Sequence, residues 1–236
     1  MLKVEAPGGA RDILLHACCA PCSGAVLECL RDNGIRPVVF FSNSNITPRG
    51  EYDHRLAELR RYADVMGVEL VEDEYDHDAW LAAVRGLEAE PERGDRCAAC
   101  FRFRLERAAR YAASRGLHVV ATTLASSRWK DLDQVNAAGL SACCGTEAAV
   151  GSENRSHPRL RKREGPASEG SGRGPATPDV FRPELPCSDV EQAEVVFWPQ
   201  NWRKGGLQER RNEVIREQGF YNQTWCGCEF SRNLNP

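Results

Sequence analysis

The chain has 236 residues, of which 42% are hydrophobic, enough for one domain with a buried core and an insertion. The formal net charge of −3 argues against a protein that binds nucleic acid through overall basicity, although local basic patches can override such a balance. No window approaches 18 apolar residues and segment 1–12 has no apolar signal region, so we expect neither a membrane span nor secretion.

Strand and helix patterns alternate along most of the chain. Runs rich in β-branched and aromatic residues indicate strands, and apolar residues at helical spacing, such as Tyr52, Leu56 and Leu59, indicate helices. Gly139 is expected to end its helix. The expected elements, in chain order, are a strand at 13–17, a helix at 20–33, a strand at 36–43, a helix at 51–66, a strand at 68–71, helices at 76–84 and 100–114, a strand at 117–124, a helix at 131–138, a strand at 194–198 and a helix at 207–218.

This alternation predicts an α/β fold, with a mostly parallel sheet and helices on both of its faces. Ligands of such sheets bind at the carboxyl ends of the strands. Segment 146–189 is rich in Gly, Pro, Ser, Arg and Glu and poor in large apolar residues, so we expect a disordered, low-complexity insertion. Residues 1–145 and 190–236 are then a single α/β domain that ends in a cysteine-rich tail.

The chain contains 11 cysteines, several of them adjacent or close in sequence. Closely spaced cysteines of cytoplasmic proteins are more often metal ligands or redox centres than structural disulfides. Because neither a signal region nor a membrane span is evident, we expect a cytoplasmic protein, and its closely spaced cysteines then indicate a metal or redox site.

The first cysteine motif, Cys18-Cys19-Ala20-Pro21-Cys22, falls where a strand is expected to lead into a helix. The N–H groups at a helix N-terminus stabilise thiolates, which favours metal binding or nucleophilic chemistry. The alternative is that these cysteines are small buried side chains of the core.

The second motif, Cys97-Ala98-Ala99-Cys100, has a spacing that iron–sulfur, zinc and redox sites share. Together with Cys18 and Cys19 it supplies the four thiolates of a 4Fe-4S cluster. A closed zinc site with the same four cysteines is the alternative.

The third motif, Cys226-Gly227-Cys228, lies in the tail. Two cysteines one residue apart close only a small, strained disulfide ring, and strained disulfides are readily reduced. A redox-active pair is one interpretation, and the binding of a second metal is the other.

Two groups of basic residues accompany the cysteine motifs. They are Arg102, Arg104, Arg107 and Arg110 near the second motif, and Arg203, Lys204, Arg210 and Arg211 before the third. Either group alone is typical of a solvated helix face, but their proximity to the cysteines favours an RNA partner.

In combination, these segments resemble the QueH family of epoxyqueuosine reductases. The matching segments are LLHACCAPCS at 14–23, NSNITPRGEYDHR at 43–55, GLEAEPERGDRCAACFRFRL at 86–105, TTLASSRWKD at 122–131, WRKGG at 202–206 and FYNQTWCGCEFS at 220–231. They extend over nearly the whole chain except the insertion.

The resemblance implies a Rossmann-like fold akin to the PP-loop (HUP-like) group and the reduction of epoxyqueuosine to queuosine at the tRNA wobble position. It also implies a 4Fe-4S cluster, an external electron donor and particular residues in each role. The implied cluster ligands are Cys18, Cys19, Cys97 and Cys100, with Cys22 as a further candidate, and the implied redox-active pair is Cys226 and Cys228. This chain has Asn201 where many members have Asp, which puts a second iron in doubt.

Reduction of an epoxide requires an acid to protonate the leaving oxygen. The candidates in this sequence are Asp131 and Tyr221, with His16 and Lys130 as further possibilities. Two other functions compete with this interpretation. One is an ATP-dependent or cluster-dependent tRNA-modifying enzyme of the PP-loop type, whose glycine-rich phosphate loop is missing after the first strand. The other is a zinc-stabilised module that binds nucleic acid.

Overall fold

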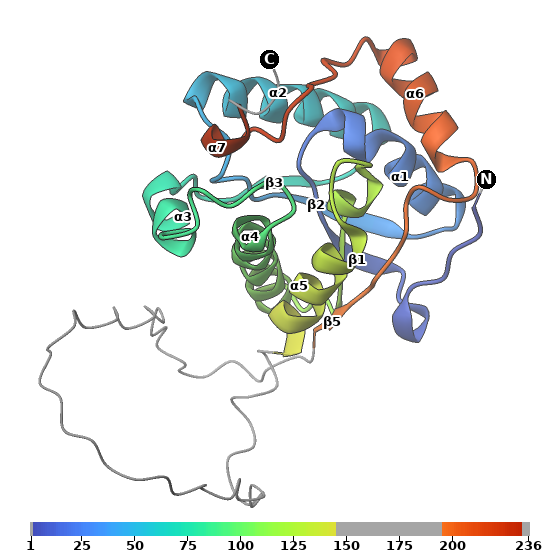
Figure 1. The fold of residues 1–236 in the computed structure, drawn as a ribbon. Helices are drawn as coiled ribbons and strands as arrows, with labels where there is room; N and C mark the ends of the chain where they lie inside the picture. The colour runs from blue at the N-terminus through green and yellow to red at the C-terminus, as the bar shows by residue number, and fades with distance from the viewer. Residues whose placement is uncertain (1, 145–194, 233–236) are drawn as a thin grey trace, which may run out of the picture.

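The computed structural model describes residues 2–144 and 195–232, and the fold is shown in Figure 1. Its strands are β1 (Asp12–His16), β2 (Arg36–Phe41), β3 (Leu70–Glu72), β4 (Val119–Thr122) and β5 (Val196–Phe197). Its helices are α1 (Ala20–Asp32), α2 (Arg49–Met66), α3 (His77–Ala83), α4 (Asp95–Ser114), α5 (Leu132–Cys144), α6 (Leu207–Gln218) and α7 (Glu229–Arg232), with 3-10 turns η1 (Pro7–Gly9) and η2 (Thr123–Ser126). None of the described helices is long and apolar enough to cross a membrane.

The five strands form one sheet in the order β3-β2-β1-β4-β5, and every neighbouring pair is parallel. In the central strand β1, Leu14 is in register with Val38 of β2 and Val120 of β4. Helices α1, α2 and α6 pack on one face of the sheet, and α4 and α5 on the other (Figure 1). The predicted α/β fold with a parallel sheet is therefore confirmed.

The core lies along β1, because a central strand covered by helices on both faces is buried on both sides. Ile13, Leu14 and Leu15 are completely buried. This explains why β1 reads as an uninterrupted apolar run rather than as an alternating one. The carboxyl end of this strand therefore opens directly from the middle of the core, and Cys18 follows it.

Two helices differ from their predicted bounds by five residues or more. Helix α4 begins at Asp95, five residues before the predicted start, so Cys97 and Cys100 lie in its first two turns. Helix α5 continues through Gly139 to Cys144. A Cβ atom at Gly139 would lie 2.3 Å from the ring of Phe197 on β5, so this glycine allows close packing and does not end the helix. The predicted insertion at 146–189 lies outside the residues that the structure describes. The predicted division of the chain into one α/β domain and this insertion therefore stays a prediction.

Candidate functional site

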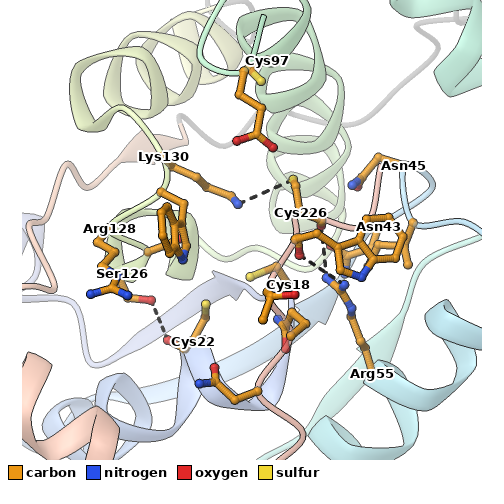
Figure 2. A pocket seen from close by; sticks show the side chains of 18 of the residues that line it. Cys18, Cys22, Asn43, Asn45, Arg55, Cys97, Ser126, Arg128, Lys130 and Cys226 are labelled. Atoms are coloured by element: carbon orange, nitrogen blue, oxygen red, sulfur yellow. Dashed lines mark hydrogen bonds between the residues drawn. The ribbon is translucent and has the colours of Figure 1, made fainter. Parts of the chain in front are cut away.

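A cavity of about 710 Å³ opens at the carboxyl ends of the strands (Figure 2). The segments after β1, β2 and β4 form its walls, and the start of α4 and the tail before α7 complete them. The topology explains this position, because the strand order reverses next to β1 and the connections to α1 and α4 leave toward opposite faces.

Three thiols meet at the end of β1. The Sγ atoms of Cys18, Cys19 and Cys22 all lie within 4.8 Å of one another, and all three side chains are buried. Cys19 is the N-cap of α1 in an extended conformation and Cys22 is three residues further on, so the first helical turn brings Cys22 back beside Cys19. This thiol triad could hold a metal.

Side chains from distant segments surround the triad. The Nε2 atom of Gln223 donates to the Sγ of Cys19 at 2.7 Å, and the Thr123 hydroxyl lies 3.8 Å from the Sγ of Cys18. Hydrogen bonds from Cys18 and Cys19, followed by the positive charges of Arg211 and Lys130, lower the pKa of Cys22. The pKa of Cys19 is raised, because its thiol donates hydrogen bonds to Cys18 and Cys22 and because it is buried. The triad therefore favours negative charge on Cys22.

Four further thiols line a smaller cavity of about 20 Å³: Cys97, Cys100, Cys226 and Cys228. Burial raises the pKa of Cys97 and of Cys100, and it raises that of Cys228 to about 12. Cys97 and Cys226 also face the large cavity, which they share with Cys18 and Cys22 (Figure 2). Both tail cysteines are free thiols, as are all nine cysteines whose side chains the structure describes.

The predicted ligands thus fall into two adjoining groups. Cys18 and Cys19 lie with Cys22, whereas Cys97 and Cys100 are not part of that compact group and lie with Cys226 and Cys228. Of the two predicted ligands on α4, Cys97 lines the large cavity together with Cys18 and Cys22, and Cys100 does not.

The donor set fits an iron–sulfur group. Buried thiols are the ligands that such clusters take, and the nearby positive charges offset the negative charge of several thiolates. A structural zinc site, by contrast, is closed by its four ligands, whereas this triad borders a wide cavity.

The candidate acids occupy very different positions. The Asp131 carboxylate accepts a hydrogen bond from the Gln134 N–H at 2.9 Å, and so caps α5 outside the cavity lining. Tyr221 is 39% exposed and its ring contacts His54, also away from the cavity. His16 is completely buried between β2 and β4, and burial, followed by the charge of Arg104, lowers its pKa to about 3. Lys130 does line the cavity.

Arg55 is a residue of the site that the sequence analysis did not identify. Its guanidinium donates to the carbonyl oxygens of Cys226 at 3.1 Å and Trp225 at 3.4 Å, and it pairs with Glu51 at 2.6 Å. The Arg55 side chain is 2% exposed. The sequence does indicate an ion pair here, because Glu51 and Arg55 are four residues apart on one face of the predicted helix. It does not indicate that Arg55 binds the tail, because the tail is remote in sequence.

Positive charge dominates the wall of the cavity. Seven cationic residues line it, and Glu92 is the single carboxylate among its lining residues; the cations are Arg55, Arg93, Arg104, Arg128, Lys130, Arg203 and Arg211. Of the predicted group on α4, Arg104 lines the cavity, whereas Arg107 pairs with Asp73 and Arg102 with Glu106. Such a wall attracts anions such as nucleic-acid phosphates.

Asn201, where the sequence departs from the pattern, also lies outside the lining of this cavity. Its Oδ1 atom accepts a hydrogen bond from the Arg203 N–H at 3.1 Å, within the turn that precedes α6. In this position Asn201 has a local partner and orders the turn.

Comparisons with known proteins agree with this architecture. The model of one protein family, described as epoxyqueuosine reductase QueH, matches residues 13–160 and 186–234. Relatives with the same description include proteins of Histophilus somni, 36% identical, and Haemophilus influenzae, 35% identical, each over 97% of this chain and 75% of its own length. The relative from Acinetobacter baylyi is 36% identical over 98% of this chain and 84% of its own length.

Proposed function

This chain belongs to the QueH family of epoxyqueuosine reductases and is an oxidoreductase, and we propose that it reduces epoxyqueuosine to queuosine in tRNA with a cysteine-bound 4Fe-4S cluster. The observation that carries the proposal is the buried thiol triad beside a cationic cavity that Cys226 of the tail also lines.

The proposed ligands of the cluster are Cys18, Cys19, Cys97 and Cys100. The position of Cys22 within the triad supports it as an additional or alternative ligand. When bound, the cluster supplies one-electron transfer and a Lewis-acidic iron. The small cavity also contains the thiols of Cys226 and Cys228. A second iron is part of the proposal only if these two thiols bind it.

The reaction removes an oxygen atom from a three-membered ring. Two C–O bonds break, one C=C bond forms, and the oxygen leaves as water after taking up two electrons and two protons. Cys226 and Cys228 as free thiols hold two electrons and two protons, and they release both when they form a disulfide. An external electron donor then returns the pair to the dithiol.

Lys130 is the acid that the geometry supports best. It lines the cavity, and its Nζ atom lies 3.7 Å from the Sγ of Cys226 (Figure 2). Its ammonium group holds a proton beside the cysteine pair. Asp131 and Tyr221 remain predictions as acids, and neither lines this cavity.

The cationic wall supports tRNA as the partner, since phosphate contacts supply most of the affinity of such complexes. Trp129 is 58% exposed at the cavity and offers a face on which an extruded base can stack. A cytoplasmic location, where tRNA and a reducing donor are both present, belongs to the same proposal.

The proposal is tested by anaerobic purification, followed by iron and sulfide analysis and an assay with tRNA that carries epoxyqueuosine. We expect a brown protein with about four iron and four sulfide ions per chain and a conversion of the modified base to queuosine. A colourless protein with zinc would contradict the cluster, and a brown protein without conversion would contradict the reaction.

A further inference from the structure

One buried asparagine in the wall of the cavity lacks hydrogen-bond partners. Asn45 is 1% exposed, and neither Nδ2 nor Oδ1 of its carboxamide has a partner in the part of the chain that the structure describes. Asn43, two residues earlier, lines the same cavity (Figure 2). Both polar atoms of its carboxamide have a partner: Nδ2 donates to the Ala17 carbonyl oxygen at 2.9 Å, and Oδ1 accepts from Arg104. A buried polar group without partners destabilises the fold, so the position of Asn45 calls for a ligand.

The loop that carries Asn45 is held on both sides. The Ser44 hydroxyl accepts from the Asp76 N–H at 3.1 Å, and the Ser44 carbonyl oxygen lies 2.7 Å from the Nδ1 of His77. On the other side, the Tyr75 hydroxyl donates to the Ile46 carbonyl oxygen at 2.9 Å. These contacts hold the backbone on both sides of Asn45, so the residue keeps its place in the cavity wall in advance of binding.

The same loop also holds the cysteine pair of the tail. The Thr47 N–H donates to the carbonyl oxygen of Gly227 at 2.9 Å, and a Cβ atom at Gly227 would lie 3.0 Å from the Ile46 side chain. Asn45 and Cys226 line the same cavity. The carboxamide therefore shares one cavity with the Cys226 thiol, and a substrate bound in that cavity can reach both.

We propose that Asn45 binds the two vicinal hydroxyl groups of the cyclopentane ring of the substrate. This inference rests on the proposed function. A carboxamide presents an acceptor and a donor side by side, and neighbouring hydroxyls can satisfy both at once. Asn45 is thus a specificity residue that holds the ring with its epoxide toward the thiols. The lactam edge of the deazaguanine base offers the same pair of groups, and the experiment separates these two sources.

The test measures equilibrium binding to two tRNAs at one salt concentration. One carries queuosine, which has the hydroxyls, and the other carries 7-aminomethyl-7-deazaguanine, which has the same base but no ring. We expect the unsubstituted protein to prefer the first. Asn45→Ala should weaken binding of that tRNA by about tenfold and leave the second unchanged, since it removes two hydrogen bonds. Asn212→Ala, an exposed asparagine at the same cavity, should keep the preference.

Three results would overturn the inference. Equal weakening of both tRNAs by Asn45→Ala would assign the residue to the base, and no weakening would leave it without a role in binding. A fall in Tm of about 4 °C or more would make Asn45 a structural residue, because removal of unpartnered polar atoms should not destabilise the fold. Failure of the unsubstituted protein to reduce epoxyqueuosine would instead contradict the proposed function.

Discussion

The Nζ atom of Lys130 lies 3.7 Å from the Sγ atom of Cys226. Burial by itself would lower the pKa of Lys130, but negative charge on Cys226, Cys18 and Cys22 outweighs burial, and the pKa is raised. The ammonium group therefore keeps its proton at neutral pH. Lys130 and Cys226 therefore place a proton donor and a source of electrons next to each other in the cavity.

Replacing Lys130 by Met should lower turnover by roughly 100-fold, because the variant loses the proton and the charge but keeps the aliphatic length. Iron content should stay at the level of the unsubstituted protein. Lys3→Met, at an exposed position away from the cavity, is the matched control. Full turnover of Lys130→Met would show that another group supplies the proton.

The cysteines should separate into two classes by iron content. Cys97→Ser and Cys22→Ser should lose most of the iron, whereas Cys226→Ser should keep most of it and lose turnover. Cys29→Ala is the control, since Cys29 is buried in α1 outside both cavities. The measurements are iron analysis, visible absorbance and the tRNA assay. Loss of iron from Cys226→Ser would favour metal binding by the tail thiols, and unimpaired turnover would exclude the redox pair.

Replacing Arg55 by Met should release the tail. The variant loses the hydrogen bonds to the carbonyl oxygens of Trp225 and Cys226, and Glu51 is left without its partner. We expect faster amide exchange over residues 220–232 and a loss of turnover, with destabilisation by about 3 kcal/mol. Arg60→Met on the same helix removes an ion pair that is half exposed and should cost less than about 0.5 kcal/mol. Equal amide exchange over residues 220–232 in the two variants would show that Arg55 does not hold the tail in place.

Replacing Gly139 by Ala should destabilise the fold by about 1–3 kcal/mol, because the added Cβ meets the buried ring of Phe197. Gly50→Ala is the matched control in α2, where the same atom would meet nothing within 4 Å. Ala is the better helix former, so this control should be neutral or slightly stabilising. Urea unfolding of both variants is the measurement, and a stable Gly139→Ala would mean that β5 can shift away from α5.

Stability should fall at alkaline pH partly through Tyr62. Burial raises its pKa from 10.0 to about 12. Its neutral form is favoured in the folded state, so this contribution is complete below pH 10 and is lost as the pH rises toward 12. Between pH 10 and 11 the free energy of unfolding should fall by about 1 kcal/mol more in the unsubstituted protein than in Tyr62→Phe. If the free energies of unfolding of the two proteins changed in parallel with pH, this prediction would be wrong. The difference between the two proteins at pH 8, where the Tyr62 hydroxyl is neutral, gives the effect of that hydroxyl on packing.

Local patterns were enough to predict most of the elements. Helix α6 begins at Leu207 and ends at Gln218, as its apolar spacing predicted, and α1 lies within one residue of its predicted bounds. The end of α5 could not be predicted, because glycine usually ends a helix and only the close approach of Gly139 to Phe197, far along the chain, accounts for its place inside the helix. A residue's neighbours along the chain carry no information on such a contact.

The sequence by itself determined the α/β class, the position of Cys18, Cys19 and Cys22 at the end of the first strand, and the family. These depend on hydrophobic periodicity and on short motifs, which are local properties. Only the tertiary structure decided that Cys22 completes a triad, that Cys97 and Cys226 face one cavity, and that Arg55 holds the tail. Sheet order and helix crossovers set these contacts, and because they join segments far apart in the chain, no local spacing specifies them.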